Sequence, residues 1–500
     1  MTSSVRGASR VDILLVLEGT FPYVRGGVSS WVYQLIREFS EYQFGVIFLG
    51  SAEEDYRGQF YELPENVTYY AEYFLYAGED SKIRHGNGSR LKNYEAVKSA
   101  HDEIKSLLGE KSFPLDINRY KDNFGISKED FFHGRESWDY LVKNYSEIPE
   151  KPAFVDYFWT IRGMHAPLWI LQDALKRAPR PKIIHCPSTG YAGYLASLIS
   201  NSTEKPLIIS EHGIYTKERR IDLMLARWLN DNQIFLKKGH HINYLRQLWV
   251  HFFEFVGKLS YQQARHITNL FAGAMEQQIA DGADPKKLLT IPNGVRVESF
   301  VSSRYTYPEK ENVVALIGRV VPIKDIKTFI RAAKILTAWE ECPEFWIVGP
   351  TEEDEEYYKE CLLLVRHLGL EKRVRFTGYQ PVETVLSQAK LTVLSSISEG
   401  LPLSVLESFA AGVPVVATDV GACRELLYGH KGGDMNAAAA GKIVSIADPE
   451  ALAGGIRDVV SDPKTWEKFS MNAIERVEKN YREKTMVDHY RRLYEDCLAN

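Results

Sequence analysis

Residues 11–49 read VDILLVLEGTFPYVRGGVSSWVYQLIREFSEYQFGVIFL, and this segment decides the fold. Val11–Leu17 is a continuous apolar run, which is typical of a strand buried on both faces of a sheet. After a turn-rich segment, apolar residues recur at helical spacing between Val28 and Phe39, and Phe44–Leu49 is the next apolar run. The order of strand, loop, helix and strand predicts a doubly wound parallel sheet of the α/β class.

The same alternation predicts two domains of similar plan. It is interrupted between about residues 55 and 150, a part rich in Tyr, Phe and charged side chains, where we expect an insertion of helices and loops. The alternation resumes at Lys182, and the polar segment Val301–Asn312 is the predicted linker. A second regular βα series follows, and an amphipathic helix is expected at about residues 463–496.

The composition is that of a globular protein with more than one domain. At about 100–200 residues per domain, 500 residues and 57.1 kDa predict two or three domains. Apolar residues make up 45% and charged residues 25%, which argues against a disordered, collagen-like or disulfide-rich chain. The 61 basic and 66 acidic residues give a net charge of −5, which does not suggest a general nucleic-acid binder.

Several sequence features indicate a cytoplasmic protein. The five cysteines are an odd number without a C-x-x-C pair, so we expect buried thiols in a reducing compartment. The first apolar run is short and is followed by acidic Glu18, which makes a poor signal peptide, and no run of about 18 apolar residues occurs. Peripheral docking on a membrane complex stays open. For the apolar segment Tyr244–Val256 a core-facing helix is favoured over a membrane-bound one, because few Lys and Arg accompany it.

The most informative chemical motif is SEGLPLSVLE at residues 398–407, between a predicted strand end and a helix start. The free backbone N–H groups near Leu403 and Ser404 would form an anion site. Glu399 lies on the loop and Glu407 about one turn into the helix. Two carboxylates on either side of an anion site suit a nucleotide-sugar, which has hydroxyls on both sides of its phosphates. A pair of surface glutamates beside a capped helix is the alternative.

Two further segments offer groups for a diphosphate. Arg319 and Lys324 follow a strand end, where fixed positive charge would stabilise a departing nucleoside diphosphate more in the transition state than in the ground state. Solvated surface cations are the alternative. Gly26 and Gly27 precede a helix and indicate either a tight turn or a close backbone approach to a ligand. They do not form a complete G-x-G-x-x-G pattern, which disfavours a dinucleotide site.

Other candidates lie after the strands of both predicted sheets. His212 follows the strand at Pro206–Ser210 and is either a donor-sugar contact or a structural histidine, and Glu211 and Arg219 near it are weaker candidates. Tyr379 could flank a nucleobase or be an exposed loop aromatic. The remaining set either lines an acceptor site or caps a helix: Ser188, Thr189, Gly190 and Tyr191.

The spacing of Glu399 and Glu407 resembles the Glu-x7-Glu signature of retaining glycosyltransferase family 4. Other segments match that family in order, over nearly the whole chain: Gly26-Gly27, Pro292–Val295 and Gly318–Lys324. Three more segments resemble the PelF-type enzymes of Pel exopolysaccharide synthesis: Glu18–Pro22, His185–Gly193 and Glu211–Arg219. The chain departs from the family pattern at Asp325, where many members have glycine.

The resemblance implies a GT-B fold, with two Rossmann-like domains that face one another across a cleft. We expect an acceptor-side domain at residues 1–305, joined by a crossover helix at about 480–500, and a donor-binding domain at 306–480. The implied donor ligands are the backbone of Gly26 and Gly27, the cations Arg319 and Lys324, Tyr379, Glu399 for the sugar, Leu403 and Ser404 for the diphosphate, and Glu407 for the ribose. Glu399, His212, Arg319 and Lys324 are the implied catalytic group.

The implied activity is retaining transfer of a hexose, glucose or a related sugar, from a UDP-sugar to a growing exopolysaccharide. Membrane-embedded synthase or export subunits are the expected partners. We expect no cofactor and no metal, because the sequence shows neither a D-x-D at a strand end nor a His/Cys cluster. A non-catalytic sugar-nucleotide- or glycan-binding subunit is the alternative, disfavoured by the joint presence of the two glutamates and two cations. An epimerase or a phosphorylase would share the architecture, but no cofactor lysine is identified.

Overall fold

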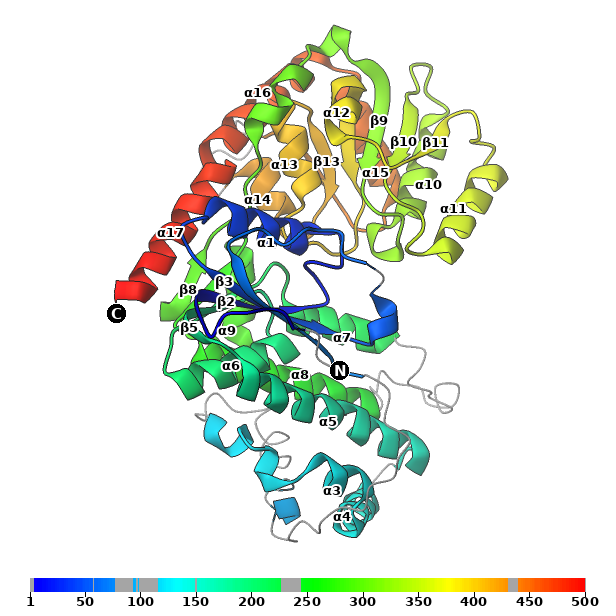
Figure 1. Cartoon of the computed structure of the whole chain (residues 1–500). Coiled ribbons are helices and arrows are strands. Elements are labelled where there is room, and N and C mark those ends of the chain that lie inside the picture. Colours follow the sequence, from blue (N-terminus) through cyan, green and yellow to red (C-terminus); the bar gives the residue numbers. More distant parts are fainter. Residues whose placement is uncertain are drawn as a thin grey trace. The chain divides into compact units, whose positions relative to one another are not determined.

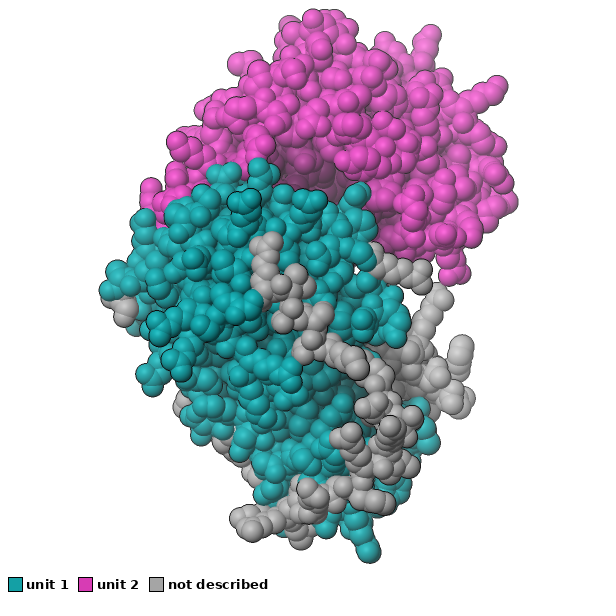
Figure 2. Space-filling model, in the orientation of Figure 1, with its two compact units in different colours: residues 1–269, 275–289, 493–500 teal, residues 270–274, 290–492 magenta. Residues whose placement is uncertain are grey.

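A computed structural model of the chain describes residues 4–56, 58–76, 93–95, 98, 116–148, 151–225, 244–429 and 439–499. It divides the chain into two compact units, coloured teal and magenta in Figure 2. Unit 1 comprises residues 1–269, 275–289 and 493–500, and unit 2 comprises residues 270–274 and 290–492. Unit 2 thus takes up the short segment 270–274 and then the long stretch 290–492, whereas the sequence predicted a boundary at 305/306 and a return at about residue 480.

Unit 1 is built on a sheet whose strand order is β1-β4-β3-β2-β5-β6-β7-β8 among the described residues (Figure 1). The strands β2 to β7 pair in parallel where they are neighbours, and β1 is antiparallel to β4. The strands are β1 (Ser4–Gly7), β2 (Arg10–Glu18), β3 (Phe44–Gly50), β4 (Val67–Phe74), β5 (Arg180–Cys186), β6 (Leu207–Ser210), β7 (His266–Asn269) and β8 (Leu288–Thr290).

The central strands of this sheet are covered on both faces, as their apolar runs predict. Every residue of β3 is buried, and in β2 Ile13–Leu17 are fully buried. The helix α6 packs against both α5 and α8 (Figure 1). The described helices of unit 1 are α1 (Gly27–Glu38), α3 (Lys128–His133), α4 (Arg135–Ser146), α5 (Phe154–Arg177), α6 (Tyr191–Thr203), α7 (Tyr215–Leu225), α8 (Tyr244–Gln263) and α9 (Gly273–Ala280, which begins in unit 2).

The expected insertion at residues 55–150 is partly wrong. Its beginning contains β4, which lies inside the sheet between β1 and β3. The helices α3 and α4 lie in its second half, as expected, whereas the turn predicted at residues 85–88 lies outside the described residues. The apolar helix α8 faces the core, because Trp249, Phe253 and Val256 are buried. Within the described part of the chain, no helix has the length and apolar content needed to span a bilayer.

Unit 2 contains a sheet with the order β11-β10-β9-β12-β13-β14 in the described residues, all paired in parallel. Its strands are β9 (Glu311–Ile317), β10 (Glu344–Val348), β11 (Val374–Gly378), β12 (Ala389–Leu394), β13 (Val415–Thr418) and β14 (Gly441–Val444). Its described helices are α10 (Ile326–Leu336), α11 (Glu355–His367), α12 (Val382–Gln388), α13 (Leu403–Ala410), α14 (Cys423–Tyr428), α15 (Pro449–Val460), α16 (Pro463–Asn480) and most of α17 (Glu483–Ala499).

The predicted linker and the predicted last helix both differ from the structure. The first part of the linker belongs to a 3-10 helix, Val297–Ser303, which packs against α12 and α13 of unit 2. The last helix is two helices, α16 and α17, separated at Tyr481 and Arg482. The backbone carbonyl of Tyr481 accepts from the N–H of Val295, and the N–H of Glu483 donates to the carbonyl of Val295, so this pairing replaces helical hydrogen bonds.

Both sheets have a position where the strand order reverses direction. In unit 1 it lies between β2 and β5, and in unit 2 between β9 and β12. Loops that leave two such neighbouring strands run to opposite sides, which opens a crevice at the carboxyl ends of the strands, where α/β proteins bind ligands. The fold therefore directs attention to the loops after β2, β5, β9 and β12.

Candidate functional site

The switch point of unit 2 joins two residues that the sequence predicted as functional. Lys324 follows β9 and Glu399 follows β12, and Lys324 Nζ lies 2.5 Å from Glu399 Oε1. Their side chains are 22% and 13% exposed, so the ion pair is partly shielded from water while one side remains open. Ser396 Oγ also donates to Glu399 Oε1, at 2.5 Å. The crevice thus contains a fixed cation and a fixed carboxylate in contact.

Backbone geometry explains why Lys324 is held at this place. Asp325 adopts the left-handed conformation (φ 44°, ψ 52°), which glycine tolerates best and Asp better than most residues. Its carboxylate accepts from the N–H of Thr328 at 3.3 Å and caps α10. Ser395 Oγ donates to the carbonyl of Lys324 at 2.8 Å. The departure from glycine at this position is thus accommodated, and the turn stays tied to the loop after β12.

Arg319 lies closer to the surface than Lys324. Its side chain is 48% exposed, and Nη1 lies 2.5 Å from Oε1 of Glu353, which is 49% exposed. An exposed ion pair of this kind contributes little to stability, so Arg319 can exchange Glu353 for a ligand anion at small cost. Gly318 before it is covered closely: a side chain on Gly349 would lie 2.0 Å from the carbonyl oxygen of Gly318. The loops after β9 and β10 are therefore packed backbone to backbone.

The helix α13 begins at Leu403 and presents the predicted anion site. Its N-cap is Pro402, which gives no side-chain cap, so the first N–H groups of the helix are not satisfied by the capping residue. Glu407 lies one turn further along and is partly buried, and its carboxylate makes no hydrogen bond or ion pair with side chains or backbone of the described residues. Burial, assisted by the negative charge of Glu383, raises the pKa of Glu407 to about 7. A partly buried carboxylate without such a partner, when ionised, is well suited to accept hydrogen bonds from the hydroxyl groups of a ligand.

Tyr379 and the glycine pair are both exposed. Tyr379 follows β11 and is 74% exposed, so its ring is available for stacking but is not held in place by packing. Gly26 is the N-cap of α1 with φ 169°, an extended conformation open to any residue, so the tight-turn interpretation is wrong. A side chain on Gly26 would meet no atom within 4 Å. The pair therefore leaves the start of α1 open to a ligand rather than serving a turn.

His212 is held by neighbours that sequence reasoning missed. Its Nδ1 lies 3.2 Å from the carbonyl oxygen of Ser210, which can only accept, so Nδ1 carries the proton and Nε2 is the acceptor in the neutral ring. The ring of Trp31 packs edge-on against it, with centroids 4.4 Å apart. Trp31 lies on α1, far from His212 in the sequence, and only its helical spacing signalled a buried face.

Glu211, a weaker candidate, is a structural residue. It is 2% exposed and accepts from Tyr261 at 2.5 Å, Gln278 at 2.9 Å and Thr189 at 3.1 Å. With its lone pairs so occupied, Glu211 joins α8, α9 and the loop after β5. Burial raises its pKa in spite of these hydrogen bonds. Thr189 therefore belongs to this buried network and not to an open acceptor surface.

Glu18, at the end of β2, is the carboxylate at the unit 1 switch point. The sequence pattern assigned it no role. Glu18 Oε2 accepts from the backbone N–H of Ala192 at 3.1 Å, and Oε1 accepts from the hydroxyl of Tyr215 at 3.1 Å. A side chain on Gly190 would lie 2.3 Å from that hydroxyl. Glu18 thus caps α6 from a different strand, and Gly190 is required for space. Arg219 stacks on Tyr215, with its guanidinium 5.1 Å from the ring centroid.

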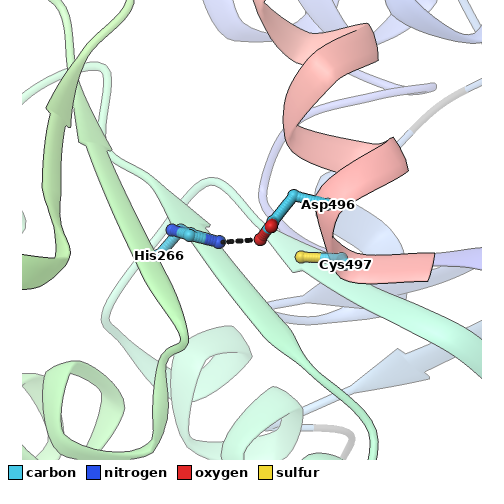
Figure 3. A group of neighbouring side chains, drawn as sticks. All are labelled: His266, Asp496 and Cys497. Carbon is cyan, nitrogen blue, oxygen red and sulfur yellow. Dashed lines mark hydrogen bonds and ion pairs between the residues drawn. The ribbon is translucent and has the colours of Figure 1, made fainter. Parts of the chain in front are cut away.

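A His/Cys group exists, contrary to the sequence expectation. His266, Asp496 and Cys497 bring three metal-capable atoms within 4.8 Å of one another (Figure 3). His266 Nε2 lies 2.9 Å from Asp496 Oδ2, and Arg265 also donates to that oxygen at 3.3 Å. Burial raises the pKa of the Cys497 thiol to about 11. A guanidinium on the carboxylate and a protonated thiol disfavour a cation here, and the group ties the end of α17 to β7.

Gly421→Ala tests whether the loop that carries Glu399 depends on its close packing against the turn after β13. Gly421 has φ +53°, and a side chain there would lie 2.3 Å from the carbonyl oxygens of both Glu399 and Gly400. We expect unfolding free energy to fall by about 1–3 kcal/mol in urea titrations. Gly454→Ala, in α15 with open space around it, is the control and should be neutral or stabilising by about 0.5–1 kcal/mol. Equal effects of the two substitutions would contradict the packing explanation.

Comparisons with known proteins identify the family and the fold of the chain. Residues 300–476, which include every unit 2 candidate named above, match the family described as Glycosyl transferases group 1. The fold is GT-B: the solved structures of Anabaena HepE in complex with UDP (TM-score 0.58, 14% identity, 97% of this chain and 100% of that one) and of sucrose-phosphate synthase from Thermosynechococcus elongatus (0.59, 16%, 98% and 99%) share it. Residues 11–286, more than half of the chain, match a second family, and the chain belongs to it: the family described as Domain of unknown function (DUF3492).

Curated relatives are more similar in sequence than these structures but cover less of the chain. The UDP-Gal:alpha-D-GlcNAc-diphosphoundecaprenol alpha-1,3-galactosyltransferase of Escherichia coli is 26% identical over 231 residues, which are 43% of this chain and 56% of that enzyme. The chain spans between 49% and 66% of the length of the first curated relatives it matches. Those relatives include galactosyl- and mannosyltransferases, so the comparison defines a class of enzymes and not one sugar.

Proposed function

We propose that the protein is a glycosyltransferase that uses a nucleotide-sugar donor and retains the configuration of the transferred sugar. The observation that supports this most directly is the Lys324–Glu399 pair at the unit 2 switch point, 2.5 Å apart and partly shielded from water. It lies in the part of the chain that matches the group 1 glycosyltransferases. A cation for the leaving diphosphate and a carboxylate for sugar hydroxyls are thereby held by one contact.

Each part of the nucleotide-sugar is then assigned a binding group within unit 2. Lys324 and Arg319 bind the diphosphate, together with the N–H groups of Leu403 and Ser404 at the start of α13. Glu407 accepts the ribose hydroxyls and Glu399 the hydroxyls of the sugar. When the diphosphate takes over Lys324, Glu399 is released from its ion pair to receive the sugar. The exposed ring of Tyr379 is assigned to the nucleobase.

The proposed chemistry needs no nucleophile from the protein. The bond between the anomeric carbon and the diphosphate oxygen breaks, and the acceptor hydroxyl attacks from the same face. Its proton passes to the departing diphosphate oxygen, whose charge Lys324 and Arg319 stabilise. We assign His212, with Nε2 as its acceptor nitrogen, and the open backbone of Gly26 and Gly27 to the sugar end of the donor. The two cations stand in place of a divalent metal, so we propose metal-independent transfer.

The finer proposal is a UDP-hexose donor, glucose or a related sugar, and a growing exopolysaccharide acceptor made with membrane-embedded subunits. It is supported by the Pel-type sequence motifs and by the ligands bound in similar solved structures, which are UDP, glucose and UDP-glucose in Anabaena HepE. A non-catalytic sugar-nucleotide-binding subunit is the second candidate. It would keep donor affinity without turnover.

Calorimetric titration with UDP, GDP and ADP, then with UDP-glucose, UDP-galactose and UDP-N-acetylglucosamine, tests the proposal. We expect a single uridine-preferring site and a preference among the sugars, both unchanged in EDTA. A coupled UDP-release assay with oligosaccharide acceptors then separates the two candidates, because only the enzyme releases UDP. Absence of binding by every nucleotide would refute both, and loss of binding in EDTA would refute metal independence.

A further inference from the structure

A buried polar cluster in unit 1 has no part in the reaction proposed above. His185, on β5, is fully buried, and both ring nitrogens are hydrogen bonded. Nδ1 lies 2.7 Å from the hydroxyl of Tyr494, and Nε2 lies 2.7 Å from Oγ of Ser210. Thr268 Oγ1 donates to the same Ser210 Oγ at 2.8 Å. Tyr494 lies on the last turns of α17, in the residues that belong to unit 1.

The imidazole at the centre of the cluster is neutral. Burial, assisted by the charge of His212, lowers the pKa of His185 to about 3. A neutral ring has one donor nitrogen and one acceptor nitrogen, which the hydroxyls of Tyr494 and Ser210 can satisfy in either tautomer. The two rings are therefore electrostatically coupled, and a change in the position of the neutral His185 ring would alter the surroundings of His212.

Two shared neighbours connect this cluster to His212. Ser210 contacts His185 through its hydroxyl and His212 through its backbone carbonyl, at 2.7 Å and 3.2 Å. Trp31 packs edge-on against both rings, with centroids 5.5 Å from His185 and 4.4 Å from His212. Movement of His185 is therefore expected to shift His212, because both rings pack against the same neighbours.

We propose that Tyr494 is a positioning residue for His212 and acts through His185. The hydroxyl of Tyr494 fixes the His185 ring, the ring fixes Ser210 and Trp31, and these hold the His212 imidazole with Nε2 as acceptor. The last turns of α17 are thus part of the apparatus that positions the sugar-binding histidine. The expected effect on turnover rests on the proposed function. The expected effect on His212 itself does not.

Tyr494→Phe tests the proposal, because it removes one hydroxyl and keeps the packing with Phe39 and Tyr42. We expect kcat to fall at least about fivefold with the Kd for UDP unchanged, since the proposed diphosphate ligands lie in unit 2. In spectra of labelled histidine, assigned with His212→Gln, the titration midpoint of His212 should move by more than about 0.5 in pH. Thr268→Val, an isosteric change at the far end of the cluster, should cause a smaller shift in the same direction.

The matched control is Asp496→Asn, two residues further along the same helix. It removes the negative charge that Arg265 and His266 contact, the His266 contact being shown in Figure 3, and it leaves Tyr494 intact. Its kcat and the His212 midpoint should stay at wild-type values. Equal losses in both variants would mean that docking of the helix end matters and not the hydroxyl, which would overturn the proposal. An unmoved His212 midpoint in folded Tyr494→Phe would overturn it as well. If the wild type lacks transfer activity but Tyr494→Phe still shifts the His212 midpoint as expected, only the proposed function is refuted.

Discussion

Lys324→Ala is expected to reduce kcat by about 10²–10³-fold, which corresponds to about 3–4 kcal/mol of transition-state stabilisation. The loss has two sources. The leaving diphosphate loses a cation that is already held in place, and Glu399, only 13% exposed, loses its ion-pair partner. Steady-state kinetics at saturating donor, with a thermal melt of each variant, measures the effect. Turnover within threefold of wild type in a folded variant would remove Lys324 from the mechanism.

Two comparisons make this result specific to Lys324. Lys327→Ala removes the same charge one turn away on α10, where the lysine pairs with Glu360 at 2.6 Å, and it should leave turnover unchanged. Arg319→Ala should also lower turnover strongly but leave the melting temperature unchanged, because its ion pair with Glu353 is exposed. Lys324→Ala, in contrast, should also lower the melting temperature, because its ion pair with Glu399 is partly buried.

Donor affinity is expected to rise with pH up to a plateau above about pH 7, and Glu407→Gln is expected to abolish this dependence. The pKa of Glu407 is raised to about 7, and only its ionised form accepts two ribose hydroxyls. Below pH 7, affinity for UDP-glucose should fall by up to about tenfold per pH unit. UDP-glucose is the suitable probe, since its diphosphate does not titrate in this range. Flat affinity in the wild type between pH 5.5 and 8.5 would exclude ribose binding by Glu407.

Ionisation of Glu407 should raise donor affinity but lower the free energy of unfolding. A carboxyl whose pKa is higher in the folded than in the unfolded state stabilises the fold when protonated, and this contribution is lost as pH rises from about 4.5 to 7. At pH 8 the Glu407→Gln variant should therefore melt above the wild type while it binds UDP-glucose more weakly. Glu383→Gln is the control and should move the midpoint of the affinity curve to lower pH, because Glu383 raises the pKa of Glu407. A structural glutamate would lose stability on substitution.

The strand and helix pattern was readable from the sequence because it depends on local periodicity. The runs at β2, β3, β9 and β12 are apolar on both faces, and the structure places each of them inside a sheet. β4 was missed since its sequence, VTYYAEYF, is rich in Tyr and carries a buried Glu72. Two tyrosine hydroxyls donate to that glutamate: Tyr70 of the same strand at 2.7 Å, and Tyr23 from a distant segment at 2.5 Å. The contact with Tyr23 and the burial of Glu72 are not visible in a local window.

The candidate site divides in the same way. Residue type and spacing identified Lys324, Glu399 and Glu407, because their segments follow strand ends and open helices. They did not reveal the role of Asp325, whose left-handed conformation is a property of the folded turn. They gave Glu211 as a candidate ligand, whereas its buried hydrogen bonds make it structural. They also excluded a His/Cys cluster, yet His266 and Cys497 meet across more than 200 residues of chain.

The sequence by itself determined the class of fold and predicted the two-domain plan and the candidate residues for a nucleotide-sugar, since periodicity, glycine placement and side-chain chemistry act within a few residues. Only the tertiary structure decided which of these groups meet and in what state. It paired Lys324 with Glu399, raised the pKa of Glu407 beside Glu383, and connected Tyr494 to His212 through His185. The physical reason is that ion pairing, burial and hydrogen bonding depend on distances between segments, which local sequence does not contain.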